Sequence, residues 1–257
     1  MTFECIVLES AEGVATIRFN RPDKLNALSK PMVQEFHAAI RQVAADPEIR
    51  CLLITGNGRA FCSGHDLASP RSTHPLSASG EYYNPALADL FHLDKPVVCA
   101  VNGACAGAGA SIALSCDIVI AAESAYFLEP FVNVGFVPDT GASWLLPRLV
   151  GRARAAGMIY LAKRIPARQA ADWGLIWDCV EDARLPGEAL AIARQLADGP
   201  PRTFGLIKTL LRETERNSYD EQAALEARLQ FIAEATDDSR EAVTAFVEKR
   251  KPRFIGR

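Results

Sequence analysis

The chain has 257 residues, enough for one large domain or for one domain with a small addition. Hydrophobic residues make up 49% of it and charged residues 23%, proportions that exclude an intrinsically disordered chain. Lys and Arg number 28 against 31 Asp and Glu, and this formal net charge of −3 argues against nucleic acid or an anionic membrane as the main partner.

The cysteines and the apolar segments both indicate a cytoplasmic protein. The seven cysteines form no Cys-x-x-Cys pair and mostly lie among aliphatic residues, which is typical of buried, reduced thiols. The first residues, MTFECIVLES, show no secretory signal. Every long apolar run is broken before it reaches the roughly 18 residues of a membrane span. We therefore expect a cytoplasmic protein without a membrane segment.

The first third of the chain is predicted to hold strands and one helix. Residues 3–9 and 13–19 are apolar or alternating, and a Glu-Gly turn between them predicts a β-hairpin. Ser29, followed by Lys-Pro, predicts the start of a helix that runs to about residue 46. Residues 51–55 are short and fully apolar, as in a strand that is covered on both faces.

The middle of the chain alternates between strands and small-residue turns. Residues 68–90 are rich in Ser and Pro and predict a long surface loop over a site. Strands are then predicted over 97–101, 117–121 and 125–127, with a helix over 107–115. Strand, helix and strand in succession imply a right-handed crossover between parallel strands.

After residue 135 the chain is predicted to be mostly helical. Helices are expected over residues 140–149, 152–162, 166–173, 186–198, 201–216 and 219–251, the last interrupted near 236–239. Phe231, Val243, Phe246 and Val247 give the final segment an apolar stripe. The stripe either packs on the protein's own core or forms a subunit interface.

Two Gly-rich segments each follow an apolar strand. Residues 56–67, GNGRAFCSGHDL, form either a simple turn or a loop whose free amides face a ligand. Residues 101–117, VNGACAGAGASIALSCD, open a helix with small residues, for close packing or for access to the helix amides. A dinucleotide fingerprint is weak here, because its third small residue would be Ile112. Two such amides aimed at one point would make an oxyanion hole.

Asp139 is the only acidic residue in the stretch FVNVGFVPDTGASWLLP. Apolar surroundings raise the pKa of a carboxyl group and make it a credible general base. The alternative is that its side chain caps the helix that follows. No nucleophile elbow Gly-x-Ser-x-Gly occurs. The histidines lack metal-ligand spacing, so we expect no metal site at His37, His65, His74 or His92.

Five motifs together resemble the enoyl-CoA hydratase/isomerase, or crotonase, superfamily. They are NRPDKLNAL from residue 20, GRAFCSGHDL from 58, VNGACAGAG from 101, VGFVPD from 134 and FVEKRK from 246. The resemblance implies an α/β fold, with a spiral of ββα turns and the acyl-CoA site over residues 1–198. It also implies a C-terminal helical trimerisation region over 199–257, with trimers that often pair into hexamers. Its substrates are acyl-CoA thioesters whose carbonyl oxygen becomes an enolate.

The resemblance also implies roles for single residues. The amides of His65 and Ala108 match the family's two oxyanion-hole donors. Phe246 and Lys249 match positions that reach the CoA of a neighbouring subunit. No metal or redox cofactor is implied, because coenzyme A is part of the substrate. The matching contacts to that CoA are Lys24, Leu25, Ser63, His65, Asp66 and Leu67.

The chain departs from the family's hydratases at their two water-positioning glutamates, which align with Ser111 and Phe131. Neither is a carboxylate, and a phenylalanine also dries the site. Glu129 stands two residues off the motif, so the role is not transferred to it. Asp139 instead matches the base of the Δ3,Δ2-enoyl-CoA isomerases and of the related ring-epoxide isomerase of phenylacetate breakdown. The surrounding VPDTGASWLLPR looks especially like that subgroup.

These residues predict an isomerase. Asp139 would remove a proton from C2 of a 3-enoyl-CoA, the amides of His65 and Ala108 would hold the dienolate, and the proton would return at C4. Three alternatives stay open: a hydratase acting on a 2-enoyl-CoA, a ring-epoxide isomerase of an aromatic acyl-CoA, and an acyl-CoA-binding protein without activity.

Overall fold

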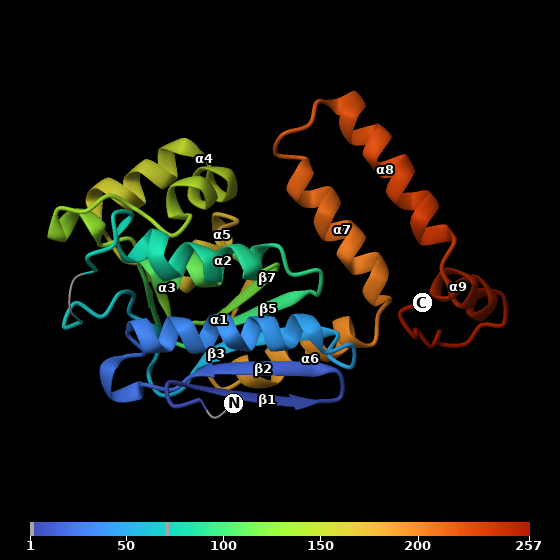
Figure 1. Cartoon of the computed structure of the whole chain (residues 1–257), viewed down its shortest axis with the longest axis horizontal. Helices are drawn as coiled ribbons and strands as arrows, with labels where there is room; N and C mark the ends of the chain where they lie inside the picture. The colour runs from blue at the N-terminus through green and yellow to red at the C-terminus, as the bar shows by residue number, and fades with distance from the viewer. Residues whose placement is uncertain (1–2, 70–71) are drawn as a thin grey trace.

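The computed structural model describes residues 3–69 and 72–257. Figure 1 shows an α/β core with a helical arm, formed by the helices over residues 201–247, beside it. The larger sheet has six strands in the order β1-β2-β3-β5-β7-β10. The predicted hairpin is antiparallel, and the strands after it pair in parallel. The strands are β1 (Ile6–Ala11), β2 (Val14–Phe19), β3 (Cys51–Gly56), β5 (Val97–Val101), β7 (Ile118–Ala122) and β10 (Asp178–Val180).

A second sheet of short strands carries the turns that follow the main strands. Its order is β4-β6-β8-β9, with β4, β6 and β8 parallel. The chain adds one strand to each sheet in turn: β3 then β4, β5 then β6, β7 then β8. This is the spiral that the resemblance implies. The strands are β4 (Ala60–Cys62), β6 (Ala104–Ala106), β8 (Tyr126–Leu128) and β9 (Ile165–Pro166).

The first helix, α1 (Lys30–Ala45), begins where the sequence predicts it and lies along β1–β3 in Figure 1. The Ser29 hydroxyl accepts a hydrogen bond from the Met32 N–H at 3.4 Å, which satisfies one of the donors left free at a helix start. Apolar residues at helical spacing form its buried face: Met32, Val33, Phe36, Ala39, Ile40 and Val43.

The prediction of a surface loop over all of residues 68–90 is wrong for its second half. A single π-helical turn, η2 (Ser79–Tyr83), runs directly into α2 (Asn84–Phe91). Tyr83 and Leu87 of this segment are buried in the core, so hydrophobic burial outweighs its many polar residues. Residues 70 and 71 of the predicted loop lie outside the described residues.

The described structure continues with seven more α-helices. They are α3 (Ala108–Leu114), α4 (Ala142–Leu161), α5 (Ala167–Asp172), α6 (Leu185–Ala197), α7 (Pro201–Glu213), α8 (Tyr219–Glu234) and α9 (Asp237–Val247). Gly151 kinks α4 at φ 76°, where the sequence predicts two separate helices. Thr236 caps α9 at the predicted interruption. Figure 1 shows α7 and α8 as an antiparallel pair beside the core, with α9 at their end. The domain boundary between residues 198 and 199 stays a prediction.

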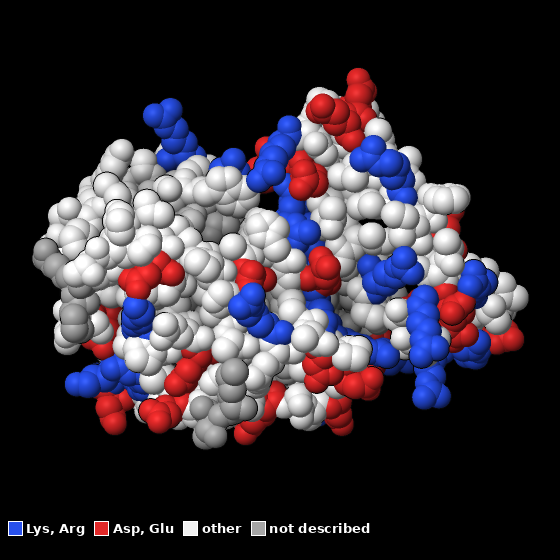
Figure 2. Space-filling view, in the orientation of Figure 1, with Lys and Arg blue, Asp and Glu red and all other residues white. Residues whose placement is uncertain are grey.

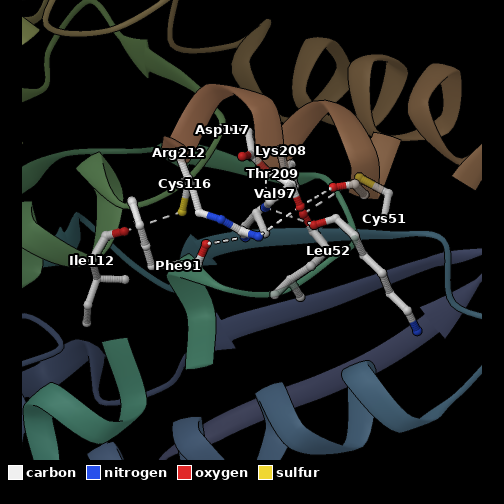
Figure 3. A network of polar contacts seen from close by, with 12 residues as sticks. Cys51, Leu52, Phe91, Val97, Ile112, Cys116, Asp117, Lys208, Thr209 and Arg212 are labelled. Carbon is white, nitrogen blue, oxygen red and sulfur yellow. Dashed lines mark hydrogen bonds and ion pairs between the residues drawn. The ribbon is translucent and has the colours of Figure 1, made fainter. Parts of the chain in front are cut away.

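An ion pair between a buried lysine and a partly exposed aspartate fixes α7 to the core (Figure 3). Lys208 is 7% exposed, and its Nζ donates to Asp117 Oδ2 at 2.6 Å and to the Lys95 carbonyl oxygen at 3.1 Å. The same Asp117 oxygen accepts the Val97 N–H at 2.7 Å. In Figure 2, positive side chains gather in the gap between the core and α7. Besides Lys208, the residues that line this gap include Arg148 and Arg212. The start of the arm is therefore anchored at the ends of two core strands.

All seven cysteines are free thiols, as the sequence predicts. Burial raises the pKa of Cys51 and of Cys62 to about 12, so both stay protonated at neutral pH. Within residues 3–69 and 72–257, we find no helix with the length and hydropathy that a membrane crossing requires.

Candidate active site

Two neighbouring strands of the small sheet, β4 and β6, end side by side, and Gly64 allows their ends to touch. Its φ is +91°, in the left-handed region that favours glycine. A Cβ at this position would lie 2.8 Å from the Ala106 carbonyl oxygen and 3.7 Å from the Ala108 nitrogen. Only a residue without a side chain permits this approach. The two Gly-rich segments of the sequence therefore meet at one edge of the sheet.

The backbone amides of His65 and Ala108 lie at this meeting point. Ala108 is the first residue of α3, and Gly107 before it turns the chain with φ 51°. In the described part of the chain, neither amide donates a hydrogen bond to another protein group. Two free donors on adjacent strand ends suit the stabilisation of an oxyanion.

The His65 loop is held from two directions. Its backbone pairs with the segment before α1, because the Ser63 N–H donates to the Leu25 carbonyl at 3.0 Å and the Leu28 N–H to the Gly64 carbonyl at 2.8 Å. The Tyr83 hydroxyl donates to the Leu28 carbonyl at 3.0 Å and lies 2.9 Å from His65 Nδ1. Since that hydroxyl has one hydrogen, His65 Nδ1 is the donor to it. No sequence pattern indicated this contact, because Tyr83 lies in the segment predicted as a loop.

Asp139 lies half-buried between η3 (Phe131–Val134) and α4. The Ser79 hydroxyl, from the start of η2, donates a hydrogen bond to Asp139 Oδ2. The alternative role of a helix cap is wrong, because Gly141 is the N-cap of α4 and no side chain caps it. The carboxylate is thus oriented by a side chain from a distant part of the chain.

The two positions of the hydratase glutamates have no acid in this structure. The Ser111 side chain is fully buried and its oxygen accepts a hydrogen bond from Thr140 Oγ1 at 2.9 Å. The Phe131 ring lies against Gly107, where an added Cβ would be 3.7 Å from Phe131 Cζ. The wall beside the Ala108 amide is therefore aromatic, and neither position offers a carboxylate to orient a water molecule.

Glu129 is the functional candidate that the sequence analysis set aside. It directly follows β8, is 1% exposed, and neither of its carboxyl oxygens has a hydrogen-bond partner among the described residues. Burial, and secondly the charge of Asp139, raise the pKa of Glu129 to about 8. The resemblance assigned Glu129 no role, because this residue stands two positions before Phe131, which aligns with a hydratase glutamate. The usable signal was an acidic residue directly after an apolar strand.

The predicted CoA contacts fall into two groups. Five of them lie on the loops around His65: Lys24, Leu25, Ser63, Asp66 and Leu67. Lys24 ends the 3-10 turn η1 (Pro22–Lys24) and is exposed, as is Leu67, whereas the Asp66 carboxylate accepts a hydrogen bond from Arg21 at 3.0 Å. Phe246 and Lys249 are exposed at the end of α9, and the structure does not bring them to these loops within one chain.

No group of three or more His, Cys, Asp or Glu side chains within residues 3–69 and 72–257 has the arrangement of a metal site.

Comparisons with known proteins agree on one family. Residues 9–257 match the family described as Enoyl-CoA hydratase/isomerase. The chain is 44% identical to the 1,2-epoxyphenylacetyl-CoA isomerase of Escherichia coli (strain K12), over 99% of both chains. It is also 44% identical to a Rhodobacter capsulatus protein named "Probable enoyl-CoA hydratase", over 100% of both.

A solved structure gives the same result for the fold. The enoyl-CoA hydratase from Bacillus anthracis superposes with a TM-score of 0.95 at 29% identity, covering 99% of this chain and 100% of that one. The predicted α/β class and crotonase-like fold are confirmed, and so is the resemblance to the ring-epoxide isomerase subgroup.

Proposed function

The chain belongs to the enoyl-CoA hydratase/isomerase family, and we propose that it is the isomerase that its site predicts, shifting the double bond of a 3-enoyl-CoA to the conjugated 2-position. One observation carries the proposal. Asp139 is a carboxylate held by Ser79, whereas Ser111 and Phe131 stand where hydratases of the family have their glutamates.

The proposed reaction moves one proton and leaves the atoms of the substrate unchanged in number. The Asp139 carboxylate takes a proton from C2 of the acyl chain, and the electron pair spreads over the thioester oxygen and the C3–C4 double bond. The amides of His65 and Ala108 stabilise the oxygen of this dienolate. Asp139 then returns the proton to C4, which leaves a double bond between C2 and C3. One base suffices, and coenzyme A enters only as part of the substrate.

The surface beside Asp139 supports an acyl chain as the group that binds there. Val134, Phe136 and Val137 precede Asp139 and are all exposed apolar side chains. Such a cluster is typical of a site that an apolar ligand or partner covers. Lys24 is exposed on the segment that pairs with the His65 loop, and its positive charge suits a phosphate of CoA.

A second candidate is the rearrangement of a ring epoxide of an aromatic acyl-CoA. The E. coli relative with 44% identity carries the name 1,2-epoxyphenylacetyl-CoA isomerase. This reaction is also an isomerisation and needs no added water, so the site around Asp139, Ser111 and Phe131 suits it equally. The two candidates differ in substrate rather than in the residues that we assign.

We also propose that the chain assembles as trimers, alone or paired into hexamers. Phe231, Val243, Phe246 and Val247 on α8 and α9 expose large apolar side chains, and a groove between α7 and α8 is lined mainly by Leu, Ile and Ala. In a trimer, Phe246 and Lys249 would reach the CoA of the next subunit. Light scattering should give about 84 kDa for three chains or about twice that for six.

The first experiment mixes the purified protein with a 3-enoyl-CoA and follows the ultraviolet absorbance of the conjugated thioester. We expect the signal to grow, and the variant Asp139→Asn to lower kcat/KM by at least about 10²-fold. Asp172→Asn, the same change at an exposed position on α5, serves as the control. Binding of a saturated acyl-CoA by Asp139→Asn would show that its site is intact.

Each contrary outcome has a defined meaning. An unchanged rate in Asp139→Asn removes this residue from the mechanism. Binding without turnover, followed by turnover of a ring-epoxide acyl-CoA, selects the second candidate. Water addition to a 2-enoyl-CoA at a comparable rate would contradict the isomerase proposal and favour a hydratase.

A further inference from the structure

Glu129 is a buried acid without a partner. It is 1% exposed, and none of the described residues donates a hydrogen bond to either carboxyl oxygen. Buried polar groups in proteins are almost always hydrogen-bonded, and an ionised carboxylate without a partner is costly in an apolar interior. Its retention in the core therefore calls for a cause outside simple packing.

Its position is next to the proposed oxyanion hole. The carbonyl of Leu128, the residue before it, accepts the Gly107 N–H at 2.9 Å, and Gly107 directly precedes Ala108. The ring of Phe131, two residues further on, lies against Gly107. The segment from Leu128 to Phe131 thus forms one wall of the site, and Glu129 is part of that wall.

Two titratable groups on other elements face Glu129. The charge of Asp139, on the segment before α4, raises the pKa of Glu129, in addition to the larger effect of burial. The charge of Glu129 in turn contributes to a raised pKa of Cys105 on β6, whose thiol is fully buried. Burial and the charge of Asp139 both oppose ionisation of Glu129, Cys105 is a neutral thiol, and no cation offsets these effects among the described residues.

The surroundings of the two carboxyl groups decide which one keeps a proton. Asp139 is half-buried, and the Ser79 hydroxyl donates a hydrogen bond to its carboxylate. Glu129 is buried and has no donor, which stabilises its protonated form. Two nearby acids in unlike environments separate into one base and one neutral acid.

We propose that Glu129 is a positioning residue that keeps its proton while the enzyme works, so that the wall beside Asp139 is neutral and dry. The proposal rests on the proposed function, in which Asp139 is the base. Loss of the proton would place a second negative charge in this wall, draw water toward it and repel the enolate. Activity should therefore fall when Glu129 ionises.

The test is the pH profile of kcat/KM with a 3-enoyl-CoA between pH 6 and 9. With a pKa of about 8, Glu129 is mostly protonated at pH 7 and about nine-tenths ionised at pH 9. We expect kcat/KM of the natural chain to fall about tenfold between these two pH values. In Glu129→Gln, which cannot ionise, the ratio of the two rates should stay near one. Glu129→Met gives the same expectation should the glutamine variant fold poorly.

Thermal unfolding supplies a readout that needs no activity. From about pH 5 up to its pKa of about 8, Glu129 holds in the folded chain a proton that the unfolded chain has already released, so the stability falls as pH rises through this range. The melting temperature of the natural chain should therefore drop more over this range than that of either Glu129 variant. Glu123→Gln is the matched control, because Glu123 is exposed and lies just before β8, the strand that Glu129 follows. This variant should behave like the natural chain in both measurements.

The possible failures are distinguishable. Isomerase activity with the same alkaline fall in the natural chain and in both Glu129 variants overturns this inference alone. The same holds if the natural chain shows no fall. A total lack of isomerase activity at every pH overturns the proposed function, and the role of Glu129 with it.

Discussion

Ser79 holds the proposed base by a single hydrogen bond, from its hydroxyl to Asp139 Oδ2. A hydrogen bond to the ionised form of a carboxyl group stabilises that form and fixes its direction. Ser79 is therefore a positioning residue, because it acts on the substrate only through Asp139.

We predict that Ser79→Ala lowers kcat about tenfold at neutral pH and leaves KM nearly unchanged, because the carboxylate of Asp139 loses the group that orients it. Ser79→Thr keeps the hydroxyl and should recover much of the rate. Ser143→Ala, at an exposed serine in the first turn of α4, is the matched control. An equal fall in Ser79→Ala and Ser79→Thr would contradict a role of the hydroxyl through Asp139 and indicate a purely structural one.

Single residues of the site differ in how visible they are in the sequence. Asp139 stands out as a lone acid in an apolar stretch, and the glycines before His65 and Ala108 mark the turns that free their amides. Ser79 and Tyr83 act only through contacts that form when η2 folds over the site. Such contacts join segments that are distant in the sequence, so no local sequence pattern predicts them.

At the scale of elements, most strands of the larger sheet and most helices follow from hydrophobic periodicity and turn residues, whereas β4, β6 and β9 of the smaller sheet were not predicted. The strands β3, β5 and β7 are short apolar runs that end near Gly, Asn or Ala, and their parallel pairing follows from the crossovers between them. The segment of η2 and α2 was missed because the Ser- and Pro-rich residues before it, and the Gly, Asn and Pro within it, are typical of a loop. Its buried face became visible only with the structure.

The anchoring of α7 gives a prediction about stability. Lys208→Met leaves the partly buried Asp117 without its cation, and we expect a loss of about 2 kcal/mol in the free energy of unfolding. Denaturant titration followed by circular dichroism measures this loss. Lys163→Met, the same change at an exposed position after α4, should be neutral within about 0.5 kcal/mol. Equal stability of the two variants would show that the ion pair does not hold the arm.

At the scale of the whole molecule, α8 and α9 expose several large apolar side chains. Phe246 is 85% exposed and Phe231 74% exposed, both on helices that the core leaves uncovered. The sequence left two readings of this stripe open. The stripe does not pack on the core of its own chain, and the proposed assembly would cover it.

An arm that reaches a neighbour makes each proposed site a product of two chains, with Asp139 from one and Lys249 from the next. Lys249→Ala should then raise KM for the acyl-CoA about tenfold, through the loss of a charged contact to phosphate, and leave kcat nearly unchanged.

Co-expression of Lys249→Ala with Asp139→Asn should yield mixed assemblies with a higher kcat/KM than either variant alone. In these assemblies some sites combine an intact Asp139 with an intact Lys249. A chain carrying both changes, co-expressed with Asp139→Asn, is the control, because none of its assemblies contains an intact Asp139. If the first mixture gains nothing over its parents, each site is complete within one chain.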